Sequence, residues 1–316
     1  MRLVFMGTPG FAVATLRRLA SSEHQVVAVV TNPDRPKGRG RRTAPPPVKE
    51  AAQELGLPLL QPESVTAPGF AEELAGLHAD LFVVVAFSIL PPELLAVPRL
   101  GSVNLHPSLL PRYRGAAPII WAVINGDTET GITTFLLNPR VDAGDILLQR
   151  PVPIDADETA GELESRLSQM GAQVMLDTVS GLADGSAVSR RQPRGRTTRA
   201  PKLAKEDARL DWAQSAASLR NRIRGTNPVP GAFTEWRGGV LKVHRAACVA
   251  ASPADDLPGT VLAADPQQGL VVAASDGALR LTQVQPQGKR PMADTDLLRG
   301  HGITPGERLG LPPGGA

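Results

Sequence analysis

The sequence MRLVFMGTPGFAVATLRRLASSEHQVVAVV, residues 1–30, contains the pattern from which the fold class follows. Residues 2–7 form a short apolar run that ends in glycine, and residues 25–31 form a second run rich in valine. Between them, residues 11–20 carry apolar side chains at the three- and four-residue spacing of an amphipathic helix. A strand, a helix and a second strand in this order are typical of a parallel sheet covered by helices.

The same alternation continues along the next 150 residues. Further strands are expected at residues 81–86, 102–106, 131–137 and 145–153. Further helices are expected at residues 47–55, 69–77, around Trp121 and at 159–182, the last with Thr159 or Asp157 as its N-cap. The predicted fold class is therefore α/β, with a Rossmann-like, doubly wound and mostly parallel sheet.

A second domain is expected after a change in composition. Residues 183–205 lose all periodicity and become rich in Gly, Ser, Arg and Thr, which is typical of a linker. Short apolar runs then recur between turn residues, which predicts a small C-terminal β-barrel of the OB-like kind. The predicted organisation is a catalytic domain at residues 1–188, a basic linker at 189–205 and a barrel domain at 206–316.

Composition limits the class of protein. A length of 316 residues suits two domains, and 42% hydrophobic with 21% charged residues is typical of globular chains. The single cysteine, Cys248, cannot form an intrachain disulfide, so a reducing compartment is expected. The apolar run at residues 3–6 is too short for a signal peptide or a membrane span. These features favour a cytoplasmic protein with no membrane partner, and we expect a monomer.

Asn104 and His106 form the first candidate catalytic pair. They lie two residues apart in SVNLH, so on a strand both side chains project from one face. Pro107 cannot continue a central strand, so the pair belongs at the carboxyl end, where open α/β sheets bind ligands. An amide and an imidazole directed at one point suit a reaction that develops negative charge on oxygen, such as acyl transfer.

Asp142 is the third candidate. It lies in VDAGD, within a turn-rich loop at residues 138–144, where a carboxylate could stabilise an imidazolium or accept a proton. For His106, the spacing alone leaves open a purely structural role, because a histidine at the end of a strand can simply form a structural hydrogen bond.

Two kinds of cofactor are not expected. The turn Gly7-Thr8-Pro9-Gly10 has only part of the GxGxxG spacing that dinucleotide binding requires, which argues against a nicotinamide dehydrogenase. The five histidines, at positions 24, 78, 106, 244 and 301, are dispersed and show no ligand spacing, so no metal is predicted.

Several ordered motifs resemble one known family. NLHPSLLPRYRGAAP at residues 104–118, GIT at 131–133 and VDAGD at 141–145 are similar to the signature of the folate-dependent formyltransferases. Outside this core, the segments FMGTP at residues 5–9, NPDRPKGRG at 32–40 and PGAFT at 230–234 resemble the branch that formylates methionine carried on an initiator tRNA. This resemblance extends over nearly the whole chain.

The resemblance implies a co-substrate, an acceptor and roles for particular residues. It implies that 10-formyltetrahydrofolate donates the formyl group to the α-amino group of initiator Met-tRNA, with no metal. Asn104, His106 and Asp142 would form the catalytic triad. The folate would contact Ser108, Leu109, Leu110 and Pro111. The C-terminal barrel would help to hold the tRNA.

A basic segment distinguishes between acceptors. Residues 34–42 combine glycine and proline with cations that could meet tRNA phosphates, and the resemblance implies a tRNA-contacting insertion here. The predicted tRNA-binding residues are Arg35, Lys37, Arg39, Arg41 and Arg42. A sugar-nucleotide formyltransferase is the nearest alternative, and a glycinamide ribonucleotide formyltransferase would leave residues beyond 205 unexplained. A non-catalytic tRNA-binding protein is the alternative from another class.

Overall fold

The computed structural model describes residues 1–37, 42–250 and 256–310. The chain divides into two compact units, each made of segments that are not continuous in sequence. The first comprises Met1–Pro118, Glu129–Pro153 and Glu164–Pro201, and the second Ile119–Thr128, Ile154–Leu163 and Lys202–Ala316.

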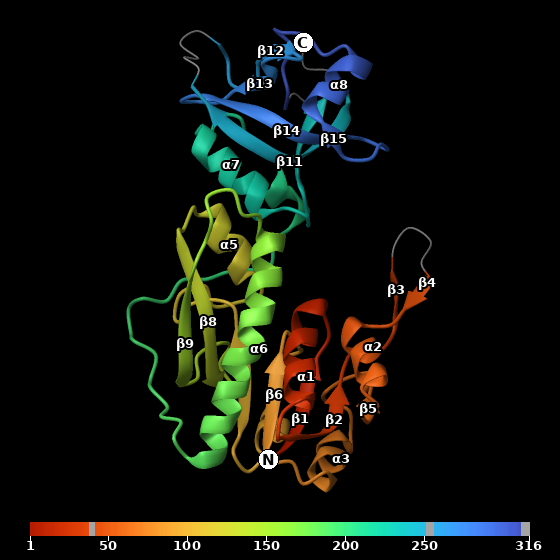
Figure 1. Cartoon of the computed structure of the whole chain (residues 1–316), viewed down its shortest axis with the longest axis vertical. Coiled ribbons are helices and arrows are strands. Elements are labelled where there is room, and N and C mark those ends of the chain that lie inside the picture. Colours follow the sequence, from red (N-terminus) through yellow and green to blue (C-terminus); the bar gives the residue numbers. More distant parts are fainter. Residues whose placement is uncertain (38–41, 251–255, 311–316) are drawn as a thin grey trace. The chain divides into compact units, whose positions relative to one another are not determined.

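The first unit is built on a seven-stranded sheet in the order β5-β2-β1-β6-β7-β8-β9 (Figure 1). Its strands are β1 (Arg2–Gly7), β2 (Gln25–Val30), β5 (Leu59–Leu60), β6 (Leu81–Val85), β7 (Ser102–His106), β8 (Glu129–Leu136) and β9 (Ile146–Pro153). The pairs from β5 to β7 are parallel, whereas β8 and β9 are antiparallel to their neighbours. The predicted mostly parallel α/β sheet is therefore confirmed.

The buried strand β1 lies in the interior of this sheet, between β2 and β6. Its residues Leu3 to Met6 have no exposed surface, which explains why polar and apolar residues do not alternate along this strand. Gly7 is required at its end, since an added Cβ would lie 2.8 Å from the Cβ of Ala12 and 3.0 Å from the carbonyl oxygen of Val85. This close approach lets the chain turn directly from the strand into the following helical segment.

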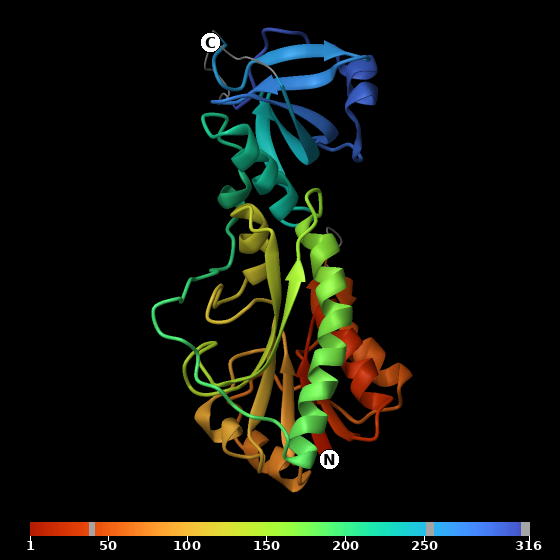
Figure 2. The same ribbon diagram turned by 60° about the vertical axis from the view of Figure 1, so that its left-hand side comes forward.

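Helices cover the sheet of the first unit. They are the 3-10 helix η1 (Gly10–Ala12), α1 (Val13–Ala20), α2 (Pro47–Glu54), α3 (Phe70–Gly76), α4 (Pro92–Leu95) and α6 (Ala160–Asp184) (Figures 1 and 2). Gly171 allows α6 to approach β7, because an added Cβ would lie 2.9 Å from Leu105. Thr178 of α6 also hydrogen-bonds the hydroxyl of Thr134 in β8, at 2.7 Å. These contacts place α6 on the sheet face that carries Leu105.

The basic segment predicted as a loop is in part a hairpin. Strands β3 (Arg35–Lys37) and β4 (Arg42–Ala44) pair antiparallel, with Arg35 opposite Ala44. At its base, Lys49 Nζ donates to both carboxylate oxygens of Asp34 at 2.8 Å, and Gln61 Nε2 donates to one of them at 3.0 Å. The bond from Lys49 is the main reason that the pKa of Asp34 is lowered. The hairpin is thus anchored to α2.

The second unit is dominated by an antiparallel sheet in the order β10-β11-β14-β13-β12, with β15 paired to β14. Its elements are α5 (Pro118–Ile124), η2 (Lys205–Ala208), α7 (Ala216–Gly225), β10 (Ala232–Trp236), β11 (Gly239–Val249), β12 (Val261–Asp265), β13 (Gly269–Ala273), β14 (Ala278–Pro286), β15 (Met292–Ala293) and α8 (Asp294–His301). Trp212 lies buried in its core, where Nε1 donates to the hydroxyl of Thr234 at 3.0 Å. The predicted antiparallel β domain is confirmed.

The start of α6 follows the predicted capping chemistry. The backbone N–H of Thr159 donates to Glu162 Oε2 at 2.9 Å, and the N–H of Glu162 donates to the Thr159 hydroxyl at 3.3 Å. This reciprocal pair is a capping box, which satisfies two amide groups that the first helical turn leaves unpaired. The bond from the Thr159 amide is the largest cause that lowers the pKa of Glu162.

We predict that Thr159→Ala lowers the free energy of unfolding by about 1 kcal/mol, because the helix loses its N-cap oxygen. Thr159→Ser keeps that oxygen and should lose much less. Ser165→Ala, at an exposed position in the same helix, should be nearly neutral. Urea denaturation of the three variants measures the differences, and equal losses in Thr159→Ala and Thr159→Ser would refute the capping role.

Candidate active site

Asn104 and His106 lie on β7 as the spacing predicts. In the register of the sheet, Asn104 is opposite Val84 of β6 and Phe135 of β8, and His106 is opposite Thr133. Val103 and Leu105 are buried on the alternate face. The amide and the imidazole therefore share one face at the carboxyl end of a strand inside the sheet.

The ring of His106 is oriented by a backbone carbonyl. Nε2 lies 2.8 Å from the carbonyl oxygen of Tyr113, and since a carbonyl only accepts, Nε2 carries the proton. Burial lowers the pKa of His106, and the charge of Arg114 lowers it further, against the opposing effect of Asp142 and of the Tyr113 carbonyl. The imidazole is accordingly neutral near neutral pH, and Nδ1 holds its lone pair.

Asp142 approaches this free nitrogen. Its Oδ2 lies 3.8 Å from His106 Nδ1, too far for a direct hydrogen bond but close enough to stabilise a charge on the ring. The same oxygen accepts the backbone N–H of Gly115 at 2.8 Å. The structure thus brings the three predicted triad positions to one end of the sheet, although Asp142 comes from the connection between β8 and β9.

The loop that carries Asp142 has little freedom. Asp142 adopts a left-handed backbone with φ of 48°, which aspartate tolerates better than most residues. An added Cβ on Gly144 would lie 1.6 Å from the carbonyl oxygen of Leu136, so only glycine fits there. These two requirements explain why the sequence reads Asp-Ala-Gly at this turn.

A pocket opens beside the triad. Asn104 and Asp142 supply polar groups to it, and the exposed apolar side chains of Ile89 and Val141 lie along its border. Its other lining residues are Val84, Phe87, Ser88, Leu90, Leu95, Leu137, Asn138, Pro139 and Arg140. An apolar concave wall with a few convergent polar groups is typical of a small-molecule site.

The predicted folate contacts lie elsewhere, in the loop that follows β7. Ser108, Leu110 and Pro111 are buried, while Leu109 is half-buried. Ser108 Oγ donates to the carbonyl of Arg112 at 2.6 Å, and Leu110 packs in a small core with Phe135. In this arrangement their side chains shape the loop behind His106 and do not line the pocket beside Asn104.

Residues 190–200, here called the strap, make interactions that sequence reasoning misses. Arg190 exchanges two backbone hydrogen bonds of 2.8 Å with Ile146 at the start of β9. Farther along, Arg114 N donates to the carbonyl of Thr198 at 2.9 Å, and Ala200 N donates to that of Arg114 at 2.7 Å. Basic composition gives no signal of this packing, because backbone pairing carries no side-chain pattern.

The predicted tRNA-binding residues are described only in part. Arg35 is exposed on β3, and the backbones of Lys37 and Arg42 pair with each other. Arg39 and Arg41 lie outside the described residues. The described part of this hairpin, which follows β2 in the chain, forms a two-stranded sheet that is separate from the sheet containing β7.

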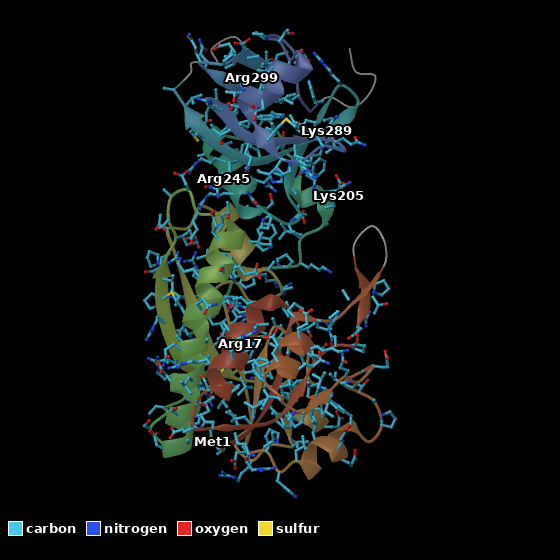
Figure 3. All side chains as sticks on the ribbon, turned by 45° about the vertical axis from the view of Figure 1, so that its right-hand side comes forward. Met1, Arg17, Lys205, Arg245, Lys289 and Arg299 are labelled. Atoms are coloured by element: carbon cyan, nitrogen blue, oxygen red, sulfur yellow. The ribbon has the colours of Figure 1, made fainter. Side chains whose placement is uncertain are left out.

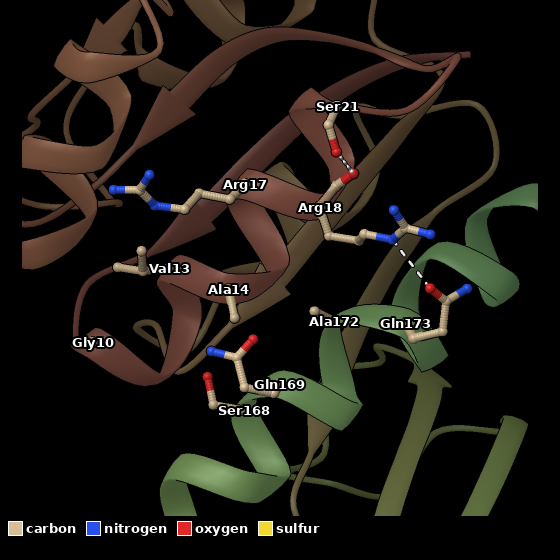
Figure 4. A pocket seen from close by; sticks show the side chains of 10 residues that line it. All are labelled: Gly10, Val13, Ala14, Arg17, Arg18, Ser21, Ser168, Gln169, Ala172 and Gln173. Carbon is tan, nitrogen blue, oxygen red and sulfur yellow. Dashed lines mark hydrogen bonds between the residues drawn. The ribbon is translucent and has the colours of Figure 1, made fainter.

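A second cavity, of about 570 Å³, lies between α1 and α6 (Figure 4). Arg18 Nε donates across it to Gln173 at 3.1 Å, and Ser168 donates to the carbonyl of Phe11 at 2.8 Å. None of the triad residues lines it. Among the described residues, we find neither a cluster of three or more His, Cys, Asp or Glu that could hold a metal nor a helix long and apolar enough to cross a bilayer.

Comparison with known proteins identifies the family. Residues 1–179 match the family model described as formyl transferase, and residues 202–302 match the model of the formyl transferase C-terminal domain. The chain belongs to the formyl transferase family. Its relatives include a methionyl-tRNA formyltransferase of Citrifermentans bemidjiense, 46% identical over 98% of this chain and 96% of that protein, and one of Methylococcus capsulatus, 47% identical over 98% and 100%.

A solved structure supports the same fold. The sugar 3N-formyl transferase WlaRD, crystallised in the presence of dTDP and 5-N-formyl-THF, superposes with a TM-score of 0.66 at 16% identity. The match covers 92% of this chain and 99% of that one. At this identity the likeness concerns the fold alone, so the choice of acceptor must come from other observations.

The electrostatics of the site give a testable pKa. Because the Asp142 carboxylate raises the pKa of His106, Asp142→Asn should lower that pKa further below its ordinary value. NMR titration of the His106 ring, assigned with a His106→Asn variant, measures the shift. Asp145→Asn removes the same charge from a nearby position that does not contribute to the shift, and it should leave His106 unchanged. An unaltered His106 pKa in Asp142→Asn would refute the coupling.

Proposed function

We propose that this chain transfers the formyl group of 10-formyltetrahydrofolate to the α-amino group of methionine on initiator Met-tRNA. The observation that carries the proposal is the convergence of Asn104, His106 and Asp142 beside an apolar pocket at the carboxyl end of β7. The methionyl-tRNA formyltransferases that are 46% and 47% identical to this chain, matched over 96% and 100% of their length, support the choice of acceptor.

The pocket beside Asn104 is the proposed site of the formyl donor. Its apolar wall, which includes Phe87, Leu90 and Leu95, suits a flat heteroaromatic ring such as a pterin. Asn104 and Asp142 stand on the polar side of the same pocket, where the formyl carbon would have to lie. A folate contact by residues Ser108 to Pro111 stays a prediction, and it would involve Leu109 most directly because its neighbours are buried.

Amine attack is the first chemical step in this proposal. The neutral amine forms a bond to the formyl carbon, and the carbonyl electron pair moves onto oxygen, where the Asn104 amide N–H can donate to the oxyanion. His106 Nδ1 takes the proton that the amine loses, because Nε2 is already committed to Tyr113. The imidazolium that results lies beside the Asp142 carboxylate, which stabilises its charge.

Collapse of the tetrahedral species completes the transfer. The bond between the formyl carbon and N10 of the folate breaks, and the leaving nitrogen takes the electron pair together with the proton held by His106. While His106 is protonated, its Nδ1–H can also donate to the oxyanion, so both residues stabilise the same charge. No covalent intermediate with the enzyme is needed, and the final products are formyl-Met-tRNA and tetrahydrofolate.

The tRNA would be held by surface cations. Lys205, Arg245, Lys289 and Arg299 are exposed in the second unit (Figure 3). Arg35 is exposed on β3, and Lys37, Arg39, Arg41 and Arg42 of the same basic segment are further proposed contacts. In this scheme residues 1–188 perform the chemistry, 189–205 connect the domains, and 206–316 bind tRNA in a cytoplasmic, monomeric enzyme. Phosphate contacts of this kind position a nucleic acid without reading its sequence.

An acceptor assay tests the proposal directly. Purified protein is incubated with 10-formyltetrahydrofolate and either Met-tRNA or an amino-sugar nucleotide, and formylated product is quantified by mass spectrometry. We expect rapid formylation of Met-tRNA and none of the sugar. Formylation of the sugar and not of Met-tRNA would identify a sugar-nucleotide formyltransferase instead. A protein that binds tRNA but formylates neither acceptor would be a non-catalytic tRNA-binding protein.

Substitution of the strand residues tests the mechanism. Asn104→Ala and His106→Ala should each reduce turnover on the order of 100-fold, because each removes a group that acts on the developing oxyanion. Asn104→Asp, which keeps the shape but replaces a donor by a negative charge, should be at least as damaging. Single-turnover rates with melting temperatures as the control for folding provide the measurement, and near-normal rates in any of the three would exclude the assigned role.

Neutralising the basic segment at residues 34–42 tests the tRNA contact. The triple change Arg39→Ala, Arg41→Ala and Arg42→Ala should weaken Met-tRNA binding and flatten its salt dependence by roughly one unit of log–log slope for each phosphate that is no longer neutralised. Folate affinity should not change. Arg99→Ala, a surface arginine paired with Asp80, serves as the control. A wild-type slope in the triple variant would show that this basic segment does not contact phosphate.

A further inference from the structure

Gln192 of the strap lies against the catalytic loop and uses both ends of its amide there. Its Nε2 donates to the carbonyl oxygens of Asp142, at 2.9 Å, and Gly144, at 2.8 Å. Its Oε1 accepts from Arg114 Nη2 at 2.6 Å and from Arg114 Nε at 3.2 Å. One half-buried side chain thus bridges two loops that approach His106 from different parts of the sequence.

The distance between these two loops determines where the Asp142 carboxylate lies. Gly115, next to Arg114, donates its backbone N–H to Asp142 Oδ2 at 2.8 Å. The peptide groups around Asp142 are held in a left-handed conformation that few residues adopt freely. Hydrogen bonds to the carbonyls of Asp142 and Gly144 add a second constraint on that conformation.

The strap itself is held independently of Gln192. Backbone hydrogen bonds attach it to Ile146 before Gln192 and to Arg114 after it, and Thr198 Oγ1 accepts the N–H of Tyr113 at 2.8 Å. Gly115 also packs tightly on it, since an added Cβ would lie 2.5 Å from the carbonyl oxygen of Ala200. Removing the Gln192 side chain therefore removes the bridge and leaves the strap attached.

We propose that Gln192 is a positioning residue for the Asp142–His106 pair. It contacts none of the reacting atoms in the mechanism described above, and it acts by keeping Asp142 Oδ2 at its 3.8 Å distance from His106 Nδ1. This proposal rests on the proposed function, because it assigns the Asp142–His106 pair to formyl transfer. The segment that composition marks as a basic linker is therefore part of the catalytic architecture.

Two substitutions separate positioning from simple attachment. Gln192→Leu removes all of these side-chain hydrogen bonds at similar size. Gln192→Glu keeps an acceptor for Arg114 but places carboxylate oxygens against the carbonyls of Asp142 and Gly144, which have no proton to offer. Both should lower kcat with Met-tRNA by about tenfold or more, because small displacements of a catalytic group have large effects on rate. KM for both substrates and the melting temperature should change little.

The matched control is Thr197→Val, a neighbouring exposed position on the strap that should keep wild-type kcat. A Gln192→Leu enzyme with normal kcat and only a lower melting temperature would overturn the proposal. If Gln192→Leu does not fold, Gln192→Glu decides, because its ion pair with Arg114 still bridges the strap to the loop. Wild-type kcat in Gln192→Glu would equally overturn it.

A second measurement needs no acceptor, so it distinguishes this proposal from the proposed function. The His106 pKa is measured by NMR with and without Asp142→Asn, first in the wild type and then in the Gln192→Leu background. A positioning role predicts a smaller effect of Asp142→Asn once Gln192 is removed. An equal effect in both backgrounds refutes the positioning role, whatever acceptor the enzyme uses. Failure of wild-type protein to formylate Met-tRNA would refute only the proposed function.

Discussion

The hydrogen bond from His106 Nε2 to the carbonyl of Tyr113 sets the chemistry that this site can perform. A carbonyl can only accept, so this 2.8 Å contact fixes which ring nitrogen carries the proton. Burial keeps the ring neutral, and the lone pair is left on Nδ1, the nitrogen that faces Asp142. The backbone of the loop after β7 therefore selects the tautomer with its lone pair on Nδ1, which the proposed mechanism uses to accept a proton from the amine.

The sheet supplies the fixed frame for this interaction. Asn104 and His106 stand on a strand that is paired on both sides, so their backbones cannot move relative to each other without breaking the ladder. Asp142 comes from a connection between two antiparallel strands and is held instead by side-chain and backbone contacts from Gly115 and Gln192. The candidate triad thus combines two members fixed by the sheet with one whose position depends on loops, among them the strap.

Several features are predictable because they are local. The runs at residues 2–7 and 102–106 form strands with the predicted bounds, and Thr159 caps α6 as expected, since apolar periodicity and cap chemistry act within a few residues. The basic stretch after Asn32 is expected as a loop because it is rich in glycine and proline, and this expectation misses its hairpin pairing. Composition marks the strap only as a linker, because its contacts are made by backbone groups and by the side chains of Gln192 and Thr198, far from their partners in sequence.

Sequence information alone establishes the α/β class, the strand that carries Asn104 and His106, and the family resemblance that indicates formyl transfer. These follow from short-range patterns and from ordered motifs. Tertiary structure is needed to decide which nitrogen of His106 is free, how far Asp142 lies from it, and that Gln192 ties the loops together. Those properties depend on distances between residues that are up to 78 positions apart, from Arg114 to Gln192. No local pattern encodes them, because they are set by how the sheet and its loops pack.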